Sequence, residues 1–434
     1  MKRMVIAYLA DNTASSTSAL QQVQTTVILL AITLVVALLS RRFRLPYTLI
    51  LVVVGLVIGF LPILTQVHLE PDLVLFLFLP ILLFEGAWNA QVKPLFADWL
   101  PIALLAIPGL GISLLLVTAS LHWGINLSWL VAILVGAMVS PTDPVAVLSL
   151  LRQLGLPERL QTIIEGESLF NDGVGAAVFE IVLAGLLPLL GLAPATDHPS
   201  FLLVAGEALW LMFAGLLLGL AIGWLVSRFL RHVDDHLIET TITVCVAYGV
   251  YLAGVYLHTS GILAVVGAGL MIGSYGKRVG LSERAREATH DVWEFLGYLT
   301  NSFLFLLMGI QIGESHLIQS LPGIGWALAG VIVGRVLMIY TLLPLHNLFA
   351  RRLVRGEREQ DRFLPLPRPI PASWYPIFTL SGLRGALSIA LVLSLPTAFA
   401  QRDLLADIVY GVVLVTLLGQ GFGLRLFLPH WQKR

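Results

Sequence analysis

Four neighbouring polar side chains lie inside a long apolar segment of this chain. The stretch Gly166–Gly173 reads Gly-Glu-Ser-Leu-Phe-Asn-Asp-Gly. On a helix, Ser168 and Asp172 share one face, and Glu167 and Asn171 share the neighbouring face, because each pair is four residues apart. A charged group at the centre of a bilayer costs at least about 2.5 kcal/mol, so two carboxylates here indicate a functional site. One face would bind an ion, and the residues of the adjacent face would hold the ion-binding face in place.

Asp172 is the candidate carrier of both a cation and a proton. Because desolvation favours the protonated form of a carboxylate, a proton can compete with a cation for this side chain. Ser168, one helical turn earlier, would add a neutral oxygen, which suits a hard cation. The alternative interpretation is structural, with a protonated aspartate and a serine that only pack between helices.

Two further segments supply candidate oxygen ligands. Glu85, with Asn89 four residues later, follows an apolar run and is expected to line the same cavity. The alternative is that Glu85 lies in water at the end of its span. Thr142 and Asp143 lie between two prolines, which remove backbone donors and free carbonyl groups that can bind a cation. For Asp143, capping of the half-helix that follows is the favoured role.

Two arginines also lie within apolar spans. Arg335 cannot lose its proton at ordinary pH and therefore needs a buried anion. Glu167 is the available partner, because Asp172 must stay free to exchange its ion, so we expect an ion pair between Arg335 and Glu167. Arg384 is expected to offset carbonyl groups near it or to pair with Asp143. The alternative for both arginines is a side chain that reaches to the membrane surface.

The composition is that of a polytopic membrane protein. Hydrophobic residues make up 57% of the 434 residues and charged residues only 12%, with a mean hydropathy of +0.89. Soluble domains contain about 25% charged residues. The net charge of zero gives no indication of a nucleic-acid partner. The single cysteine, Cys245, excludes an internal disulfide. Because the sequence has no phosphate-binding loop, zinc-protease helix or nucleophile elbow, we expect neither a cofactor nor an enzymatic activity.

Apolar runs of about 20 residues, the length that a helix needs to cross a bilayer, predict roughly thirteen transmembrane helices. The expected limits are 22–39, 46–64, 72–90, 99–121, 127–150, 162–191, 201–229, 237–257, 260–275, 292–313, 321–349, 373–396 and 404–427. No stretch resembles a soluble domain, so the prediction is a single all-α membrane domain over 1–434. The connection from Ala350 to Pro371 is expected to be a linker. The first residues, with Lys2 and Arg3 before a short apolar run, are not expected to form a cleaved signal peptide.

Basic residues are concentrated in alternate connections between these spans. The basic connections contain Arg41, Arg42, Arg44, Lys93, Arg152, Arg159, Arg228, Arg231, Lys277, Arg278, Arg284, Arg286 and the arginines from 351 to 368. The facing connections, such as 65–70, 123–126 and 193–200, contain almost none. By the positive-inside rule, we expect a plasma (inner) membrane protein with its amino terminus outside and its carboxyl terminus in the cytoplasm.

Two spans contain helix-breaking sequences. One reads Ser-Pro-Thr-Asp-Pro after Val139, and the other reads Ser-Gly-Leu-Arg-Gly from Ser381. By the loop assignment above, the two spans cross the membrane in opposite directions. Interrupted spans in the two halves indicate inverted repeats with a site near the membrane midplane. We therefore expect a first repeat over 22–191, a linker helix over 201–229 and a second, inverted repeat over 237–427.

The residues that carry this pattern resemble those of a known family. They are Phe84, Glu85, Gly86 and Ala87; Thr142, Asp143 and Pro144; the run from Glu167 to Gly173; Arg335; and Gly382, Leu383, Arg384, Gly385 and Ala386. From about Ile28 to Leu426 the chain resembles sodium/proton antiporters of the monovalent cation:proton antiporter superfamily. The closer resemblance is to the electroneutral branch, which contains the NhaP-type transporters and the eukaryotic sodium/proton exchangers.

This resemblance implies thirteen helices in a core domain and a dimerisation domain, a homodimer, and an elevator-like movement of the core. It implies that Asp172 carries the ion with Glu85, Ser168 and Thr142 near it. It also implies that Glu167 pairs with Arg335 to hold Asn171 in place.

Residue types at two of these positions predict the transported charge. Electrogenic relatives have an aspartate in the place of Asn171 and tend to have a lysine in the place of Arg335. The neutral amide and the arginine found here imply that one monovalent cation exchanges for one proton. The expected cation is Na⁺, and Li⁺ is expected to be transported as well. Potassium/proton exchange by the same mechanism is the nearest alternative, since oxygen ligands alone do not select among alkali cations. A cation channel is a more distant alternative.

Overall fold

The computed structural model describes residues 27–38, 47–60, 74–143, 148, 151, 155–189, 201–314, 317–356 and 367–431. Within these ranges the backbone is helical or irregular and forms no strand, so the predicted all-α class is confirmed. The expectation of an uncleaved amino terminus concerns residues outside this set.

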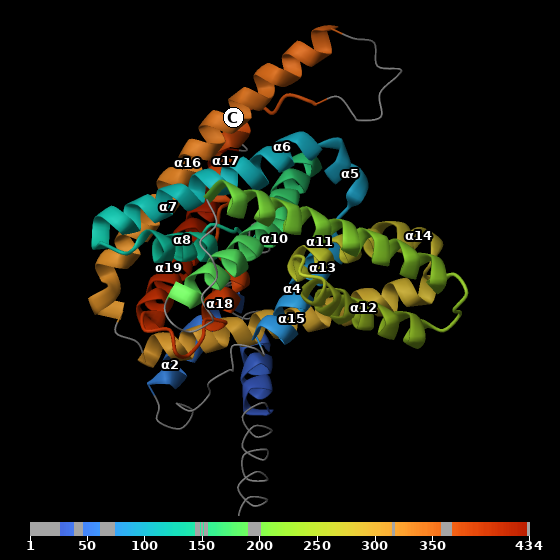
Figure 1. Ribbon diagram of the computed structural model, residues 1–434, viewed down its shortest axis with the longest axis horizontal. Coiled ribbons are helices and arrows are strands. Elements are labelled where there is room, and N and C mark those ends of the chain that lie inside the picture. Colours follow the sequence, from blue (N-terminus) through green and yellow to red (C-terminus); the bar gives the residue numbers. More distant parts are fainter. Residues whose placement is uncertain are drawn as a thin grey trace, which may run out of the picture. The chain divides into compact units, whose positions relative to one another are not determined.

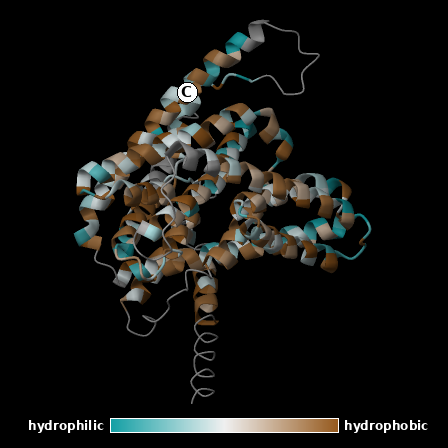
Figure 2. Cartoon of the chain, viewed as in Figure 1, coloured by the Kyte–Doolittle hydropathy of each residue, from teal (hydrophilic) through white to brown (hydrophobic). Residues whose placement is uncertain are grey.

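Seven of the described helices are long and apolar enough to cross a membrane. They are Trp99–Ile125, Glu158–Pro188, Leu209–Leu230, His236–Tyr256, Gly261–Val279, Glu283–Gly313 and Leu317–Arg352. Shorter apolar helices cover Val27–Leu38, Tyr47–Gly59, Val74–Asn89 and Trp129–Val139. Figure 2 shows hydrophobic residues along most of the length of the helices. The chain is therefore a multi-pass membrane protein.

Every predicted span coincides with a helical segment of the described chain. Helix α15 (Glu283–Glu314) begins before its predicted limit at residue 292, and helix α16 (Leu317–Gly356) continues past its predicted limit at residue 349. The expected linker therefore begins later than Ala350, and residues 357–366 of it lie outside the described ranges. Arg351 and Arg352 are exposed and lie on the last turns of this helix, where cations are favourable.

The chain divides into two compact units. The first comprises Met1–His68 and Asn301–Ser315. Within it, α2 (Tyr47–Gly59) crosses the carboxyl-terminal part of α15 (Glu283–Glu314) at very short range. A Cβ atom added to Gly55 would lie 2.9 Å from the Cα of Gly309. Small residues on both helices permit this approach, which is a common packing device within membranes.

The second unit comprises Leu69–Thr300 and His316–Arg434. Its segments before α11 (Phe201–Leu230) are η1 (Val74–Phe78), α4 (Leu79–Asn89), α5 (Val92–Ala97), α6 (Trp99–Leu104), η2 (Leu105–Gly109), α7 (Leu110–Ile125), α8 (Trp129–Val139) and α10 (Glu158–Leu189). After it come α12 (His236–Tyr256), α13 (Gly261–Met271), η3 (Ile272–Gly276), α14 (Lys277–Val279), the first part of α15, α16, η5 (Ala372–Trp374), α17 (Tyr375–Leu380), α18 (Ala386–Leu393) and α19 (Arg402–Trp431).

Packing in the second unit places α10 at its centre. Helix α10 contacts α8, α13, α6 and α4, and α18 contacts both α8 and α19 (Figure 1). Helix α13 packs against α11 and α4, and α16 packs along α7. The polar segment of α10 is consequently surrounded by other helices, which is the environment that its carboxylates require.

Candidate cation and proton site

Both predicted helix interruptions are present. Helix α8 ends at Val139 and is followed by irregular backbone, and the gap between α17 and α18 covers residues 381–385. The two breaks contact each other through the backbone, since the amide of Asp143 donates to the carbonyl oxygen of Leu383 over 2.8 Å. Each break thus supplies a partner to backbone groups that the other leaves without an intrahelical bond.

Arg384 is buried at the point where the breaks meet. Its Nε donates to the carbonyl oxygen of Val139 over 2.7 Å, and its Nη1 donates to the carbonyl oxygen of Gly382. The expectation that Arg384 offsets carbonyl groups is confirmed. Beside it, Gly385 lies against Asp143 so closely that an added Cβ would overlap the carboxylate. The residues that Asp143 would cap, 144–147, lie outside the described ranges.

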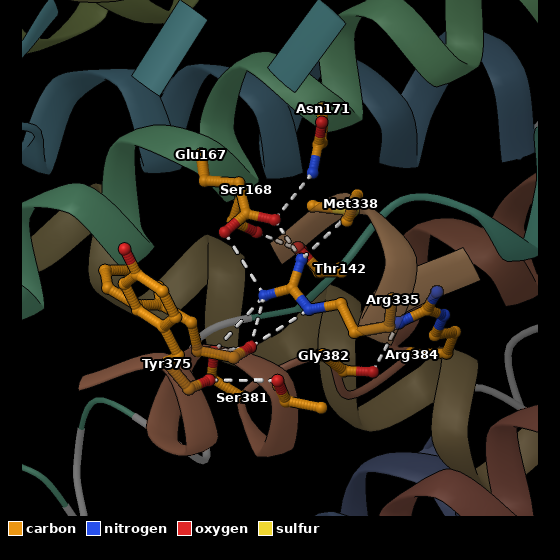
Figure 3. A network of polar contacts seen from close by, with 12 residues as sticks. Thr142, Glu167, Ser168, Asn171, Arg335, Met338, Tyr375, Ser381, Gly382 and Arg384 are labelled. Carbon is orange, nitrogen blue, oxygen red and sulfur yellow. Dashed lines mark hydrogen bonds and ion pairs between the residues drawn. The ribbon is translucent and has the colours of Figure 1, made fainter. Parts of the chain in front are cut away.

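Arg335 and Glu167 form the predicted ion pair (Figure 3). Arg335 on α16 is 3% exposed and Glu167 on α10 is 1% exposed. One guanidinium nitrogen pairs with Oε1, and the other donates to Oε2 over 3.2 Å. The same guanidinium donates from Nε and Nη2 to the carbonyl oxygen of Phe378, at 3.0 and 2.7 Å, and from Nη2 to Ser381 Oγ at 3.3 Å. This two-point geometry fixes Glu167 and neutralises its charge.

The pair also orients the neighbouring amide. Asn171 is 1% exposed, and its Nδ2 donates to Oε1 of Glu167 over 3.4 Å. Arg335, Glu167 and Asn171 therefore form a connected network on one face of α10 (Figure 3). This is the arrangement expected for the residues that support the site.

The adjacent face of α10 contains Ser168 and Asp172. Ser168 is buried, and its hydroxyl donates to the carbonyl oxygen of Thr142 at the first helix break. Asp172, one turn later, is partly exposed. The described residues supply no hydrogen bond or ion pair to its carboxylate. Asp172 is thus the acidic group of this segment that remains available, while Glu167 is engaged.

Glu85 approaches the same region from α4. Asn89 donates from Nδ2 to its Oε1 over 2.7 Å, and Gly297 of α15 faces its side chain. Asp143 lies near enough to both Glu85 and Asp172 for an electrostatic interaction with each. Glu85, Asp143 and Asp172 thus come from separate segments to the same region of the fold.

Some partners in this region were not predicted. The carbonyl oxygens of Phe378 and Val139 accept from the two buried arginines, although every residue offers such an acceptor and the sequence gives no signal for these two. The contact of Lys277 with Trp88, described below, was also missed, because the sequence indicated only a basic connection at residue 277. The helix end at Asn89 was the available signal, since its carbonyl groups need donors.

Comparisons with known proteins agree with this geometry. The family model for the transmembrane sodium/hydrogen exchanger matches residues 28–429. The low-affinity Na⁺/H⁺ antiporter NhaS1 of Synechocystis is 36% identical over 91% of this chain and 72% of its own length. The Na⁺/H⁺ antiporter ApNhaP of Aphanothece halophytica is 38% identical over 91% of this chain and 72% of its own length.

A solved structure shares the fold. The sodium proton antiporter MjNhaP1 of Methanocaldococcus jannaschii superposes with a TM-score of 0.69, at 18% identity, over 93% of this chain and 96% of that one. At this identity the likeness concerns the fold alone. Together with the match over most of the sequence, it leads to one conclusion: the chain belongs to the sodium/hydrogen exchanger family.

Proposed function

We propose that this protein is a secondary antiporter that exchanges one Na⁺ for one H⁺ across the membrane. The two substrates compete for the carboxylate of Asp172, and the protein changes its access between the two sides only when one of them is bound. Li⁺ is expected to replace Na⁺. The names of the relatives, which are sodium/proton antiporters, support Na⁺ over K⁺ as the cation.

The observation that carries this proposal is the contrast between Glu167 and Asp172, which lie on neighbouring faces of α10. Glu167 is buried and neutralised by Arg335, whereas Asp172 is partly exposed and has no partner among the described residues. A carboxylate without an ion-pair partner can load and release an ion, and one that is locked in an ion pair cannot. Competition for a shared ligand couples the two fluxes without a second site.

Oxygen atoms near Asp172 suit an alkali cation. Ser168 donates its hydroxyl proton to Thr142, so the lone pairs of its oxygen remain available for a cation. Glu85 contributes a second carboxylate at the end of α4. We assign Asp172, Glu85, Ser168 and Thr142 as ligands of the transported cation, since hard cations take oxygen ligands.

The residues beside Asp172 support an electroneutral exchange. Asn171 carries no titrating proton, and Arg335 cannot lose its proton. Of the two carboxylates in the segment Gly166–Gly173, only that of Asp172 is then free to alternate between a cation and a proton. Each cycle therefore moves one positive charge in each direction.

The proposal also covers the oligomeric state of the protein and its orientation in the membrane. We assign a homodimer whose core carries the ion between the two sides, in the inner membrane, with the amino terminus outside. Contacts of Arg159 support the assignment of the basic connections to one side. Its guanidinium pairs with Asp98 over 2.7 Å and donates to the carbonyl oxygens of Arg368 and Pro369, so three connections meet there. The positive-inside rule places all three connections in the cytoplasm.

The test is exchange in proteoliposomes of the purified protein under an imposed pH gradient, with Na⁺, Li⁺ and K⁺ supplied in turn. We expect proton release with Na⁺ and Li⁺, and none for Asp172→Asn, which keeps the size of the side chain but cannot hold either ion by charge. Activity of Asp172→Asn equal to that of the wild type would remove the assignment. Exchange with K⁺ alone would replace Na⁺ by K⁺ in the proposal.

The coupling ratio is tested in the same vesicles with the membrane potential clamped by valinomycin and potassium. The initial rate of exchange should not change with the potential. A rate that follows the potential would contradict one-for-one exchange.

A further inference from the structure

A lysine outside the predicted site holds the end of the helix that carries Glu85. The Nζ atom of Lys277 donates to the carbonyl oxygen of Trp88 over 2.7 Å. The same ammonium lies 4.0 Å from the centroid of the Trp88 ring, which is fully buried. A hydrogen bond to the backbone and a cation–π contact therefore act on one residue of α4.

The contact with Lys277 supplies a cationic donor, which the last turn of α4 lacks. The helix ends at Asn89, with no basic residue of its own in its last turn. The last carbonyl groups of a helix have no intrahelical donor, and the negative end of its dipole favours a nearby cation. Among the described residues Lys277 forms no ion pair, so its charge is directed at the helix end and the ring.

Glycines before Lys277 allow their backbone to lie very close to the last turns of α4. An added Cβ at Gly273 would lie 2.6 Å from the carbonyl oxygen of Trp88, and one at Gly269 would lie 2.7 Å from the Cβ of Ala87. The π-helical turn η3 then precedes Lys277 directly. Such turns shift the register of the residues that follow, and they are frequent at functional sites.

The end of α4 in turn orients Glu85. Asn89, the residue after Trp88, donates to the Glu85 carboxylate over 2.7 Å from the last turn of the helix. If that turn frays, the amide of Asn89 moves and the carboxylate of Glu85 loses its fixed position. A cap on the carbonyl group of Trp88 restrains this turn.

We propose that Lys277 is a positioning residue for cation binding, because it caps α4 and thereby fixes Asn89 and the Glu85 carboxylate toward the ion. This inference rests on the proposed function, in which Glu85 is a ligand of the transported cation. Lys277 itself does not contact the ion.

The test compares Lys277→Met with the wild type in Na⁺-driven exchange, with the apparent KM for Na⁺ and the Vmax per folded transporter measured separately. We expect KM to rise about tenfold while Vmax stays within about twofold, because only ligand placement is lost. Lys277→Arg keeps the donor and the ring contact and should retain a KM near that of the wild type. Arg278→Gln, at the exposed neighbour, is the matched control and should change nothing.

A merely structural role would give another result. Lys277→Met would then lower the melting temperature or Vmax and leave KM unchanged, and that outcome would overturn the inference. If Lys277→Met does not fold, Lys277→Gln keeps a donor without the charge and should raise KM about threefold. An unchanged KM there would also overturn it.

A double variant identifies the route of the effect. In a Glu85→Gln background, Lys277→Met should raise KM by less than about twofold further, because the same carboxylate mediates both effects. A further rise in KM as large as that caused by Lys277→Met alone would show that Lys277 does not act through Glu85. If the wild type itself exchanges no cation for protons, the proposed function fails and this inference fails with it. If the wild type exchanges normally and the Lys277 variants match it, only the positioning role fails.

Discussion

Arg384 donates from Nε to the carbonyl oxygen of Val139 over 2.7 Å, across a sequence separation of 245 residues. The arginine of one helix break therefore satisfies the last turn of the other interrupted helix. The backbone bond from Asp143 to Leu383 joins the same two segments. Because each break completes the other, the two interrupted helices form one structural element beside the candidate site.

Removal of the Arg384 side chain should disrupt this element. Arg384→Gln leaves the carbonyl groups of Val139 and Gly382 without their charged donors, and each unsatisfied buried group costs about 1–3 kcal/mol. We expect a clear fall in the melting temperature in detergent and loss of most Na⁺-driven exchange. Arg278→Gln, at an exposed position, is the control. An Arg384→Gln protein as stable and active as the wild type would show that these bonds are dispensable.

The Arg335 and Glu167 pair gives a prediction about coupling. Arg335→Met or Glu167→Gln alone leaves a buried partner unpaired and should destabilise the protein by about 3–5 kcal/mol. The double variant should be less destabilised than the sum of the two, because neither charge is then left without its partner. Thermal unfolding of the three variants in detergent measures this. Strict additivity would mean that the two side chains contribute independently.

Gly385 is expected to tolerate no side chain. An added Cβ would overlap the Asp143 carboxylate, so Gly385→Ala should separate the two breaks and reduce exchange at least about tenfold. Gly249→Ala is the matched control, because Gly249 lies exposed in α12 with nothing near its Cβ position. That variant should be neutral or slightly stabilising. Equal activity of the two variants would contradict the crowding at Gly385.

Competition at Asp172 predicts a specific pH dependence. As the pH falls, protons occupy the carboxylate more often, so the apparent KM for Na⁺ should rise by up to about tenfold per pH unit. Vmax at saturating Na⁺ should stay nearly constant. Ser168→Ala should raise KM at every pH and keep this slope, because it weakens cation binding without adding a titrating group. A fall in Vmax at constant KM would indicate that the proton acts at a different site.

Local sequence determined the helices and much of the chemistry. Hydropathy placed every span, because the length of an apolar run and the thickness of a bilayer are local quantities. Proline and glycine patterns located both interruptions for the same reason, since they act on the backbone where they occur. The partner of Arg335 also followed from the residues, because a buried guanidinium needs a carboxylate. Glu167 was the carboxylate that did not have to stay free for ion exchange.

Only the tertiary structure decided which backbone atoms the buried cations contact. Arg384 bonds to Val139, Arg335 to Phe378 and Lys277 to Trp88. A carbonyl oxygen is present at every residue, so no residue type marks the one that will be used. The choice depends on which helix ends meet in space, and that is set by the packing of small residues such as Gly269 and Gly273 against neighbouring backbone.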